Sequence, residues 1–480
     1  MKKKVLLYNA MQTAYANSDN SPSFSLMALS AYLKQKGYQA ELLLNNCSDT
    51  ELKNTLKDCL AVGFSLYTGG TRDAFKIASR IRSFSPELPL IWGGYHPTLE
   101  ADQCLQSDYI DYVIRGQGEI TLLELLKNFE KPDENLLESV KGLSYKKNGE
   151  ISHNETRESS NINGFPSFDY GLYGHVFKNA SEATYITSRG CPFSCKFCCS
   201  SSFNRNHGMK FYQLSLDRVF SDLEFLISTY NLEKINFFDD NFFIESGRIR
   251  KFVEGYKKRG FNFQWTAYGR CRFFANAEDD LIKKLKETGL ERIFFGVESG
   301  SQMILNMVNK QMKTDDVLLA LRKITQFGIL GDFTFINGFP NEKVLDVFKS
   351  LGLRNKIKKI SPKSSVRFFV FTPLPGTEML ETCEKLGYKK PEGVRDWKSY
   401  EYHSFKAPWL SRSYQSFVNS ISWAAQFSEL DPSIGTNILS KLVFKFLAKD
   451  ADFRFKHKIF FLSPEFKIIN TIYRRKIIRG

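Results

Sequence analysis

Long apolar segments are missing from this chain of 480 residues. No stretch approaches the roughly 18 consecutive apolar residues of a membrane-spanning helix, so the sequence predicts no transmembrane segment. No secretory signal is expected, because the basic start at residues 1–4 leads into a short apolar stretch that breaks at Asn9. We therefore expect a protein of the reducing cytoplasm.

Disulfide and zinc patterns are also lacking. The nine cysteines are an odd number and do not indicate a disulfide framework. Six of them are scattered along the chain: Cys47, Cys59, Cys104, Cys199, Cys271 and Cys383. The chain has only six histidines, and His207, the first one after the cysteine-rich segment, has no second histidine three to five residues further on. Zinc therefore remains only an alternative, because its usual ligand spacing is missing.

The composition is that of a folded protein with a sizeable core, since 42% of the residues are hydrophobic and 14% are aromatic. The length predicts two or three domains. The formal net charge of +15 is unevenly distributed, because residues 441–480 contain 11 Lys/Arg and 3 Asp/Glu. The excess charge therefore describes a basic C-terminal segment more than the whole surface.

Three cysteines close together are the most informative feature that is present. Cys191, Cys195 and Cys198 lie within eight residues. Three thiolates on one short loop can hold three corners of a 4Fe–4S cluster. The fourth iron then has no protein ligand and can bind a cofactor or a substrate. The spacing favours such a cluster over a zinc site.

Strands and helices alternate over residues 1–130. Buried strands are expected at 4–9, 39–44, 61–65, 88–92 and 110–114, with helices over 22–37, over 72–84 and after the last strand. This alternation predicts a Rossmann-like domain with a parallel sheet covered on both faces. Ligands bind at the carboxyl ends of such strands. Three of these ends, at 65–70, 93–96 and 115–119, contain two glycines each.

This order of elements, with Gly-Gly-Tyr-His-Pro-Thr at 93–98 and Arg-Gly-Gln-Gly-Glu at 115–119, resembles the cobalamin-binding domain that precedes many radical S-adenosylmethionine enzymes. The resemblance implies that nine residues contact cobalamin: Ser65, Tyr67, Thr68, Gly93, Gly94, Tyr95, His96, Gly116 and Glu119. Many cobalamin domains carry Asp-x-His-x-x-Gly, whose histidine ligates cobalt, and that motif is missing. The resemblance therefore implies cobalamin without this lower ligand, and His96 is expected as a turn residue near the corrin.

A polar, irregular stretch over 131–180 is expected to link two domains, with short strand-like pieces near 143–145 and 151–152. Six further strands are expected between 181 and 395, with helices between most of them: 183–187, 234–238, 263–267, 292–296, 331–336 and 366–371. Each ends in polar or glycine-rich sequence. Barrels of alternating strands and helices place their chemistry at these carboxyl ends.

Residues 181–380 resemble the radical S-adenosylmethionine enzymes, whose fold is a partial (β/α)6 TIM-like barrel. Cys191, Cys195 and Cys198 match the Cys-x-x-x-Cys-x-x-Cys loop of that family, and Phe197 is the aromatic residue expected to pack on adenine. The resemblance implies that the open iron binds S-adenosylmethionine and that an electron from the cluster cleaves it to a 5′-deoxyadenosyl radical. An external electron donor such as flavodoxin or ferredoxin is then implied.

The resemblance also implies roles for residues at the ends of the barrel strands. Asp239 and Asp240 are expected to accept hydrogen bonds from the ammonium group of S-adenosylmethionine or to cap the following helix. Arg270 is expected to pair with the carboxylate of the cofactor, and Arg272 is the alternative. Glu298, with Ser299 or Ser301 beside it, is expected to bind the ribose hydroxyls. No catalytic residue can be assigned.

Residues 396–480 are expected to form a mainly helical, basic region, with an amphipathic helix over 415–430. Between 436 and 480, Phe, Ile and Leu alternate with Lys and Arg. Such a segment fits a helical cap with its lysines in solvent, or contact with an anionic membrane surface or a lipid-like substrate. Nucleic acid, bound through phosphate and stacking contacts, is the least favoured partner.

Together, the two resemblances imply a cobalamin-dependent radical enzyme. The favoured reaction is methylation of an unactivated carbon of a small-molecule or lipid-like substrate, with methylcobalamin as the methyl donor. The alternatives are ring formation, ring contraction or oxidation without methyl transfer, and an iron–sulfur protein with a binding or regulatory role. Thiomethylation of transfer RNA is less favoured, because the chain has no second trio of cysteines.

Overall fold

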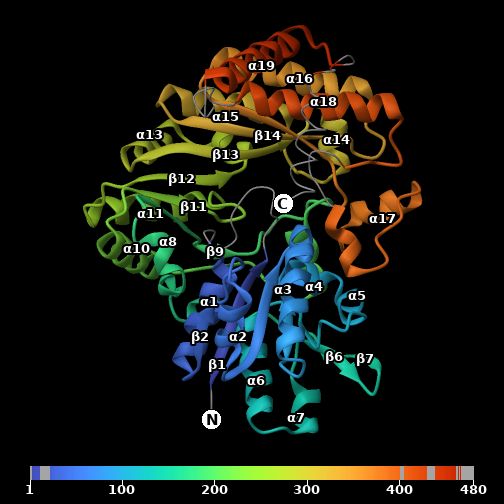
Figure 1. The fold of residues 1–480 in the computed structure, drawn as a ribbon. Coiled ribbons are helices and arrows are strands. Elements are labelled where there is room, and N and C mark those ends of the chain that lie inside the picture. The colour runs from blue at the N-terminus through green and yellow to red at the C-terminus, as the bar shows by residue number, and fades with distance from the viewer. Residues whose placement is uncertain are drawn as a thin grey trace.

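The computed structural model describes residues 3–10, 22–399, 405–429, 438–460, 463 and 465. These residues form two α/β units, each built on its own sheet (Figure 1). The N-terminal unit contains seven strands and the following unit contains six. A short two-stranded ribbon, β9 (Ser188–Arg189) with β10 (Tyr212–Gln213), flanks the cysteine loop.

The five predicted strands form the parallel part of the N-terminal sheet, in the order β2-β1-β3-β4-β5. They are β1 (Lys4–Ala10), β2 (Gln39–Leu42), β3 (Cys59–Leu66), β4 (Leu90–Gly93) and β5 (Tyr112–Ile114). Their helices are α1 (Phe24–Gln35), α2 (Asp49–Leu56), α3 (Thr71–Phe84), α4 (Tyr95–Leu99), α5 (Ala101–Leu105) and α6 (Gly118–Glu130). Helices α1 and α6 pack on one face, and α2, α3 and α5 pack on the other.

Alternation along β1 explains these two layers. Val5 and Leu7 are buried with α1 and α6, whereas Leu6 and Tyr8 are buried with α3 on the opposite face. A central strand buried on both faces reads as a continuous apolar run, which is how the sequence predicted it. The Rossmann-like architecture is confirmed.

The sheet continues into the segment that was expected to link the two domains. After α7 (Glu134–Ser139), the strands β6 (Leu143–Lys147) and β7 (Glu150–His153) add to β5 in antiparallel order. Helix α8 (Gly174–Phe177) then leads to the second sheet. The sequence located the two strand pieces but not their pairing with β5, which depends on contacts distant along the chain.

The second sheet is wholly parallel, in the order β15-β14-β13-β12-β11-β8. Its strands are β8 (Glu182–Tyr185), β11 (Lys234–Phe237), β12 (Gln264–Gly269), β13 (Leu290–Glu298), β14 (Leu330–Asn337) and β15 (Ser365–Val370). Among the described residues, the outer strands β8 and β15 do not pair with each other. The predicted six-stranded, partial TIM-like barrel is therefore confirmed.

Helices between these strands cover the convex face. The long ones are α10 (Leu216–Tyr230), α11 (Ser246–Lys258), α13 (Asp279–Glu287), α15 (Thr314–Gln326) and α16 (Val344–Ile360). Short helices follow the cysteine loop and the strand ends: α9 (Cys199–Asn206), α12 (Cys271–Asn276), α14 (Gln302–Met307) and α17 (Glu378–Lys385). Much of the core between sheet and helices is aromatic, with Phe237, Phe242, Phe252 and Trp265 in mutual ring contact.

The segment after α17 returns to the N-terminal unit. Trp397 donates a hydrogen bond through Nε1 to Oε1 of Gln103 at 2.5 Å. The guanidinium of Arg395 lies 4.8 Å from the ring centres of both Phe75 and Tyr109. Lys390 pairs with Glu100 at 2.5 Å. These contacts fix the two units relative to each other.

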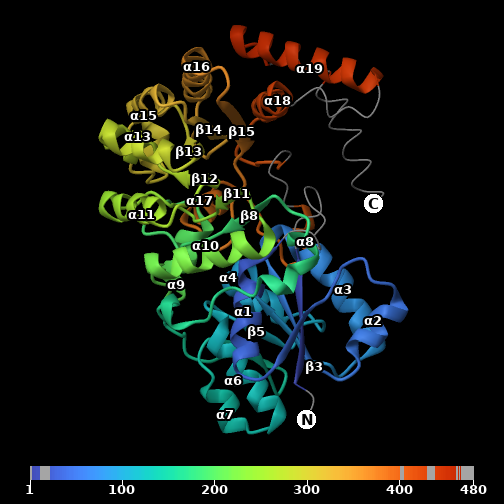
Figure 2. The same cartoon turned by 90° about the vertical axis from the view of Figure 1, so that its left-hand side faces the viewer.

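Two long helices complete the barrel on its β15 side. Helix α18 (Arg412–Ser428) packs against β15, and α19 (Ile438–His457) packs on α18. Figure 2 shows α18 between α19 and the sheet, with α19 at the outer edge of the molecule. No helix within the described ranges is long and apolar enough to cross a bilayer.

Candidate active site

The cysteine loop lies at the carboxyl ends of the barrel strands and is held by backbone contacts from two sides. The amide of Lys196 donates to the carbonyl of Val308 at 3.0 Å, and the amide of Met379 donates to the carbonyl of Lys196 at 3.2 Å. The Asn309 side chain donates to both the carbonyl and the hydroxyl of Ser194. The loop after α14 and the first turn of α17 therefore fix the shape of the cysteine loop.

The three thiols lie close enough to influence one another. The pKa of Cys191 is raised to about 11, first by burial, with smaller contributions from Asp240, Cys198 and Cys195. In the described part of the chain, no three His, Cys, Asp or Glu side chains converge on a point that suits one metal ion. A 4Fe–4S cube does not need such convergence, because each thiolate binds a different iron.

Two buried cations face this loop, one directly after β12 and the other in the loop after α14. Arg270, directly after β12, places Nη1 3.9 Å from the sulfur of Cys195, and its guanidinium lies 3.9 Å from the ring centre of Phe193. Lys310 pairs with Glu298 at 2.7 Å, and both side chains are about nine-tenths buried. Burial opposes the charge of Lys310, but Glu298 and Cys195 outweigh it and raise the pKa of the lysine. Positive charge is therefore concentrated beside the thiolates.

Backbone strain is concentrated in the same loops. Glu298 at the end of β13 has φ +68°, and Asn309 and Gln311 on either side of Lys310 have φ +53° and +54°. Residues with side chains rarely adopt this left-handed region, and each instance costs on the order of 1 kcal/mol or more. The strain aims Glu298 and Lys310 at each other across the site.

Several buried polar atoms at these strand ends have no protein partner. They are both amide atoms of Asn241, Nη2 of Arg270, both amide atoms of Asn337 and Oε1 of Glu342. An unsatisfied buried polar group costs roughly 1–3 kcal/mol, so such a cluster suits a polar ligand that supplies the missing bonds. An amino acid and nucleoside cofactor such as S-adenosylmethionine has donors and acceptors of the required kinds. The residues present therefore fit this group.

The other expected residues of this site have different surroundings. Phe197 packs on Phe339, with ring centres 6.0 Å apart, in a small apolar cluster beside Lys310. Ser301 is fully buried and donates its hydroxyl to Asp346 on α16 at 2.6 Å. That bond anchors α16 to the loop after β13, and contact of Ser301 with the cofactor stays a prediction.

The two aspartates after β11 are not helix caps, because Glu245 occupies the cap position of α11. The carboxylate of Asp239 accepts hydrogen bonds from the amide and hydroxyl of Thr187 and from the hydroxyl of Ser188. Burial raises the pKa of Asp239 to about 6 despite these bonds. Asp239 thus fixes the strand that leads into the cysteine loop, and Asp240 beside it faces a cavity.

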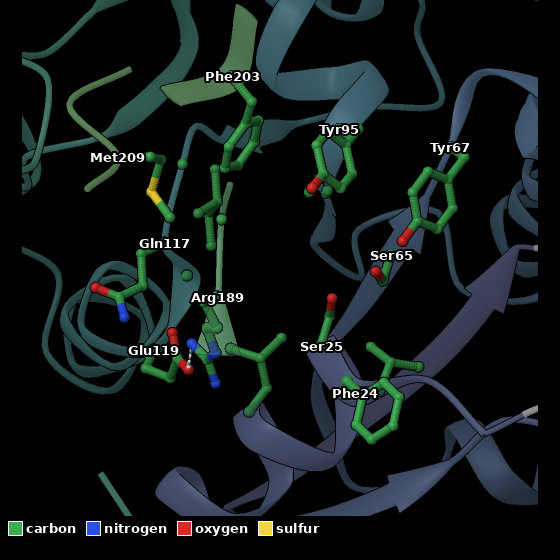
Figure 3. Close-up of a pocket in the computed structure, with 18 of the residues that line it drawn as sticks. Phe24, Ser25, Ser65, Tyr67, Tyr95, Gln117, Glu119, Arg189, Phe203 and Met209 are labelled. Atoms are coloured by element: carbon green, nitrogen blue, oxygen red, sulfur yellow. Dashed lines mark hydrogen bonds and ion pairs between the residues drawn. The ribbon is translucent and has the colours of Figure 1, made fainter. Parts of the chain in front are cut away.

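That cavity, of about 280 Å³, lies between the two units. The strand ends of the N-terminal sheet form one wall, and the segment before the cysteine loop forms the other. Its lining includes seven of the nine residues expected to contact cobalamin: Ser65, Tyr67, Gly93, Gly94, Tyr95, Gly116 and Glu119. Figure 3 shows Tyr67, Tyr95 and Phe203 along one side of the cavity and Glu119 with Arg189 on another.

Glycines make room for a large ligand at this wall. Gly94 has φ +97°, and a Cβ atom there would lie 2.8 Å from the carbonyl oxygen of Leu66. A Cβ atom on Gly93 would meet no atom closer than 3.7 Å. Only glycine fits the turn at 94, and the backbone at 93 is left open for close approach by a ligand. This wall therefore leaves backbone open to a ligand in the cavity.

Aromatic rings connect the N-terminal wall to the helix after the cysteines. Tyr67 and Tyr95 stack with ring centres 5.2 Å apart, and Tyr95 contacts Phe203 of α9 at 4.7 Å. The hydroxyl of Tyr95 lies 3.2 Å from that of Ser200, two residues after Cys198. On another side, Glu119 pairs with Arg189 at 2.5 Å. The wall of the cavity is thus tied directly to the cysteine segment.

Two of the nine expected residues do not line the cavity. His96 is fully buried, with Nδ1 3.3 Å from the hydroxyl of Thr68 and its ring against Trp397. The short helix α4 turns its side chain away from the cavity and towards the returning C-terminal segment. The expectations that His96 lies near the corrin and that Thr68 contacts it therefore stay predictions.

Sequence reasoning also missed residues that the structure brings to the site. Lining residues without an earlier assignment include Phe24, Ser25, Gln117, Arg189, Phe203 and Met209. Glu342 is buried after β14, accepts hydrogen bonds from the amide of Gly338 and the hydroxyl of Tyr414, and has its pKa raised to about 8 by burial. Only the strand-end position of Glu342 could have indicated it from sequence.

Comparison with known proteins agrees with this division of the chain. The family model described as Radical SAM superfamily matches residues 185–351, and the one described as B12 binding domain matches residues 18–126. Uncharacterized methyltransferase PH0819 of Pyrococcus horikoshii is 30% identical over 325 residues, covering 67% of this chain and 68% of that protein.

Two further relatives carry names of characterised reactions. Anaerobic magnesium-protoporphyrin IX monomethyl ester cyclase of Rubrivivax gelatinosus is 23% identical over 401 residues, covering 80% of this chain and 69% of that protein. Cytidylyl-2-hydroxyethylphosphonate methyltransferase of Streptomyces wedmorensis is 22% identical over 460 residues, covering 81% of this chain and 83% of that protein.

Solved structures share the fold. The cobalamin-dependent S-adenosylmethionine radical enzyme OxsB, with aqua-cobalamin and S-adenosylmethionine bound, matches with a TM-score of 0.72 at 20% identity, covering 98% of this chain and 75% of that one. The radical S-adenosylmethionine methyltransferase TsrM from Kitasatospora setae matches with a TM-score of 0.67 at 14% identity, covering 94% of this chain and 99% of that one.

Proposed function

The chain belongs to the cobalamin-binding radical S-adenosylmethionine enzymes, and on this premise we propose that it transfers a methyl group to an unactivated carbon atom. Its cofactors are a 4Fe–4S cluster, S-adenosylmethionine and cobalamin. When bound, they supply a 5′-deoxyadenosyl radical and a transferable methyl group. The protein's task is to hold them, and the substrate between them, in the right geometry.

One observation carries the proposal. The cavity at the N-terminal strand ends is also lined by Gly190, next to Cys191, and by Phe238 and Asp240 at the end of β11. A ligand in the cavity therefore faces the cysteine loop and the mouth of the barrel at the same time. A radical formed at one and a methyl donor held in the other can reach the same substrate carbon.

Charge supports the cluster side of this arrangement. Arg270 and Lys310 lie beside the thiolates, where they offset the negative charge of a thiolate-bound cluster and of a cofactor carboxylate. Asp239 holds Thr187 and Ser188, and the Glu119–Arg189 pair holds the next residue of the chain. Contacts at three consecutive residues therefore position the start of the cysteine loop.

We place the substrate on the concave face of the barrel, beyond Phe238. Phe238 is 55% exposed and lies edge-on to Tyr268 at 5.2 Å, and Tyr268 stacks on Phe294 at 4.8 Å. Arg367 on β15 is exposed and acts electrostatically on Tyr268. This row suits a small-molecule or lipid-like substrate with an apolar body and an acidic group.

The cluster needs an electron from an external donor, and we propose that this donor is a flavodoxin or a ferredoxin. We also place it in the reducing cytoplasm, since nine free cysteines and an oxygen-sensitive type of cluster suit that compartment. Peripheral membrane contact through the basic C-terminal region is the last part of this proposal. The basic, partly exposed helix α19 supports that contact.

A second candidate is radical chemistry without methyl transfer. The likeness to the magnesium-protoporphyrin monomethyl ester cyclase and to 4′-phospho-dehydrooxetanocin synthase of Priestia megaterium, 25% identical over 338 residues, favours it. Both candidates use the same cluster and the same radical, so the fate of S-adenosylmethionine separates them.

The test is anaerobic reconstitution with iron, sulfide and hydroxocobalamin, followed by turnover on extracts of cells that lack the gene. Methyl transfer predicts a product heavier by about 14 Da, the mass of one CH₂, with S-adenosylhomocysteine and 5′-deoxyadenosine formed together. Formation of 5′-deoxyadenosine and a product without S-adenosylhomocysteine would establish the second candidate instead. As matched variants, Phe238→Ala should reduce product formation, whereas Phe225→Ala on α10, with 56% exposure, should not.

A further inference from the structure

We infer that the outward face of α19 docks on an anionic lipid bilayer. This refines the membrane contact of the proposed function but does not depend on methyl transfer. Helix α19 covers residues 438–457 and packs through Leu447, Ala451 and Phe455, which are 5%, 0% and 0% exposed. The ring of Phe455 stacks on Phe368 of β15 at 5.9 Å, so the inward face is firmly seated.

The outward face carries large apolar side chains instead of polar ones. Ile438, Leu442, Phe446 and Phe453 are 79%, 59%, 66% and 56% exposed. Their spacing of four, four and seven residues places them on one stripe of the helix, opposite the buried face. Single exposed apolar residues are ordinary, but four along one stripe mark a surface that meets an apolar partner.

Lysines lie along the same outward side. Lys441, Lys445, Lys449 and Lys456 are exposed and form no ion pair with any described residue. All three acidic residues after position 440 are already paired: Asp450 and Glu465 with Arg454, and Asp452 with Arg354. The positive charge of this face is therefore uncompensated within the described chain.

Charge decides which partner fits. An interfacial helix buries its apolar stripe at the boundary between headgroups and acyl chains, while lysines meet anionic headgroups, and α19 has both parts. A second copy of the same face would bring lysines against lysines. The last fifteen residues of this chain contain five Lys/Arg and no Asp/Glu, so their charge does not complement the lysines of α19. An anionic bilayer complements the apolar stripe and the lysines together.

The test is co-sedimentation of the full chain with vesicles of phosphatidylcholine alone and of phosphatidylcholine mixed with phosphatidylglycerol. We expect binding to the anionic vesicles only, reduced by salt. Leu442→Ser/Phe446→Ser should weaken it at least about tenfold, and each of Lys441→Gln, Lys445→Gln and Lys449→Gln by about fivefold. Phe225→Ser, at an equally exposed phenylalanine on α10, is the matched control and should bind like the wild type.

Thermal unfolding of each variant shows whether the fold is retained, and sedimentation velocity shows whether the chain self-associates. The inference is overturned if the wild type does not bind anionic vesicles or if the α19 variants bind them like the wild type. It is also overturned if Leu442→Ser/Phe446→Ser converts a dimer to a monomer, because a second copy then covers the stripe. S-adenosylmethionine cleavage by reconstituted Leu442→Ser/Phe446→Ser should equal that of the wild type, so failure of docking leaves the proposed reaction untouched.

Discussion

The two sides of the active site are built by different means. The N-terminal side is shaped by backbone and rings: glycines at 93, 94 and 116, and the stacked pair Tyr67 and Tyr95. The barrel side is built from buried charge and strained backbone, with Arg270, Lys310 and Glu298 around the cysteine loop. A large preformed macrocycle needs shape, whereas an anionic cluster and a zwitterionic cofactor need compensating charge. The contrast predicts which substitutions damage which cofactor.

The largest effect should come from the cysteine loop. Cys195→Ala should abolish S-adenosylmethionine cleavage, a loss of at least about a hundredfold, because the cluster loses one of its three ligands. Iron content after reconstitution and 5′-deoxyadenosine formation measure this. Cobalamin binding should remain, since it depends on the other wall. Cys104→Ala, at a fully buried cysteine of the N-terminal unit, is the control and should retain the cluster.

Breaking the buried ion pair should come next. Lys310→Met leaves Glu298 buried without its partner, which costs about 3–5 kcal/mol of stability. Differential scanning calorimetry of the protein without cofactors should show the loss, and Glu298→Gln/Lys310→Met should recover part of it. The exposed pair Lys257–Glu287 provides the comparison, since Lys257→Met should cost far less stability than Lys310→Met. Equal losses at the two pairs would contradict the contrast between the sides.

The protonation of Glu342 gives the barrel side a pH signature. Its carboxyl has a pKa of about 8 in the folded protein against 4.5 ordinarily, so the folded state keeps a proton that the unfolded chain releases. Stability from this group is full below 4.5 and declines as pH rises to about 8. Glu342→Gln keeps an acceptor but does not titrate. As the pH rises from 4.5 to about 8, the free energy of unfolding of the variant should increase relative to that of the wild type, by at most about 1.4 kcal/mol for each pH unit. Parallel melting curves for both proteins across the window would refute the assignment.

The smallest effect should be the most selective one. Gly94→Ala places Cβ 2.8 Å from the Leu66 carbonyl oxygen at φ +97°, so the wall must shift at a cost of about 1–3 kcal/mol. Gly37→Ala, with φ +84° and no atom within 4 Å, imposes similar backbone strain without the clash. Absorbance titration with hydroxocobalamin should show weaker binding for Gly94→Ala alone. S-adenosylmethionine cleavage should be similar in both variants.

Local patterns allowed much of the molecule to be predicted, and distant contacts account for the errors. The cysteine loop and the strand ends at Asp239, Arg270 and Glu298 are local signals, and all lie at the carboxyl ends of barrel strands. Lys310 was missed because its partnership with Glu298 depends on two strained turns and not on any periodicity. The burial of His96 was not predicted, because Trp397, about three hundred positions along the chain, provides its packing surface.

Two further differences have similar causes. Helix α2 was not predicted, although Ser48 and Glu51 form a capping box at its start, because its eight residues carry only two buried leucines. The strands β6 and β7 were assigned to a linker because antiparallel pairing with β5 leaves no trace in a short polar segment. Neither difference affects the site, since no residue of these elements lines the cavity.

The central claim is that one chain brings a cluster-bound cofactor and cobalamin to opposite walls of a single cavity. Metal and cofactor analysis of the anaerobically reconstituted chain tests it most directly. The account predicts about four irons and about one cobalamin per chain in the wild type, with cobalamin alone retained in Cys195→Ala. A chain that assembles the cluster but binds no cobalamin, with Gly94→Ala indistinguishable from the wild type, would contradict it.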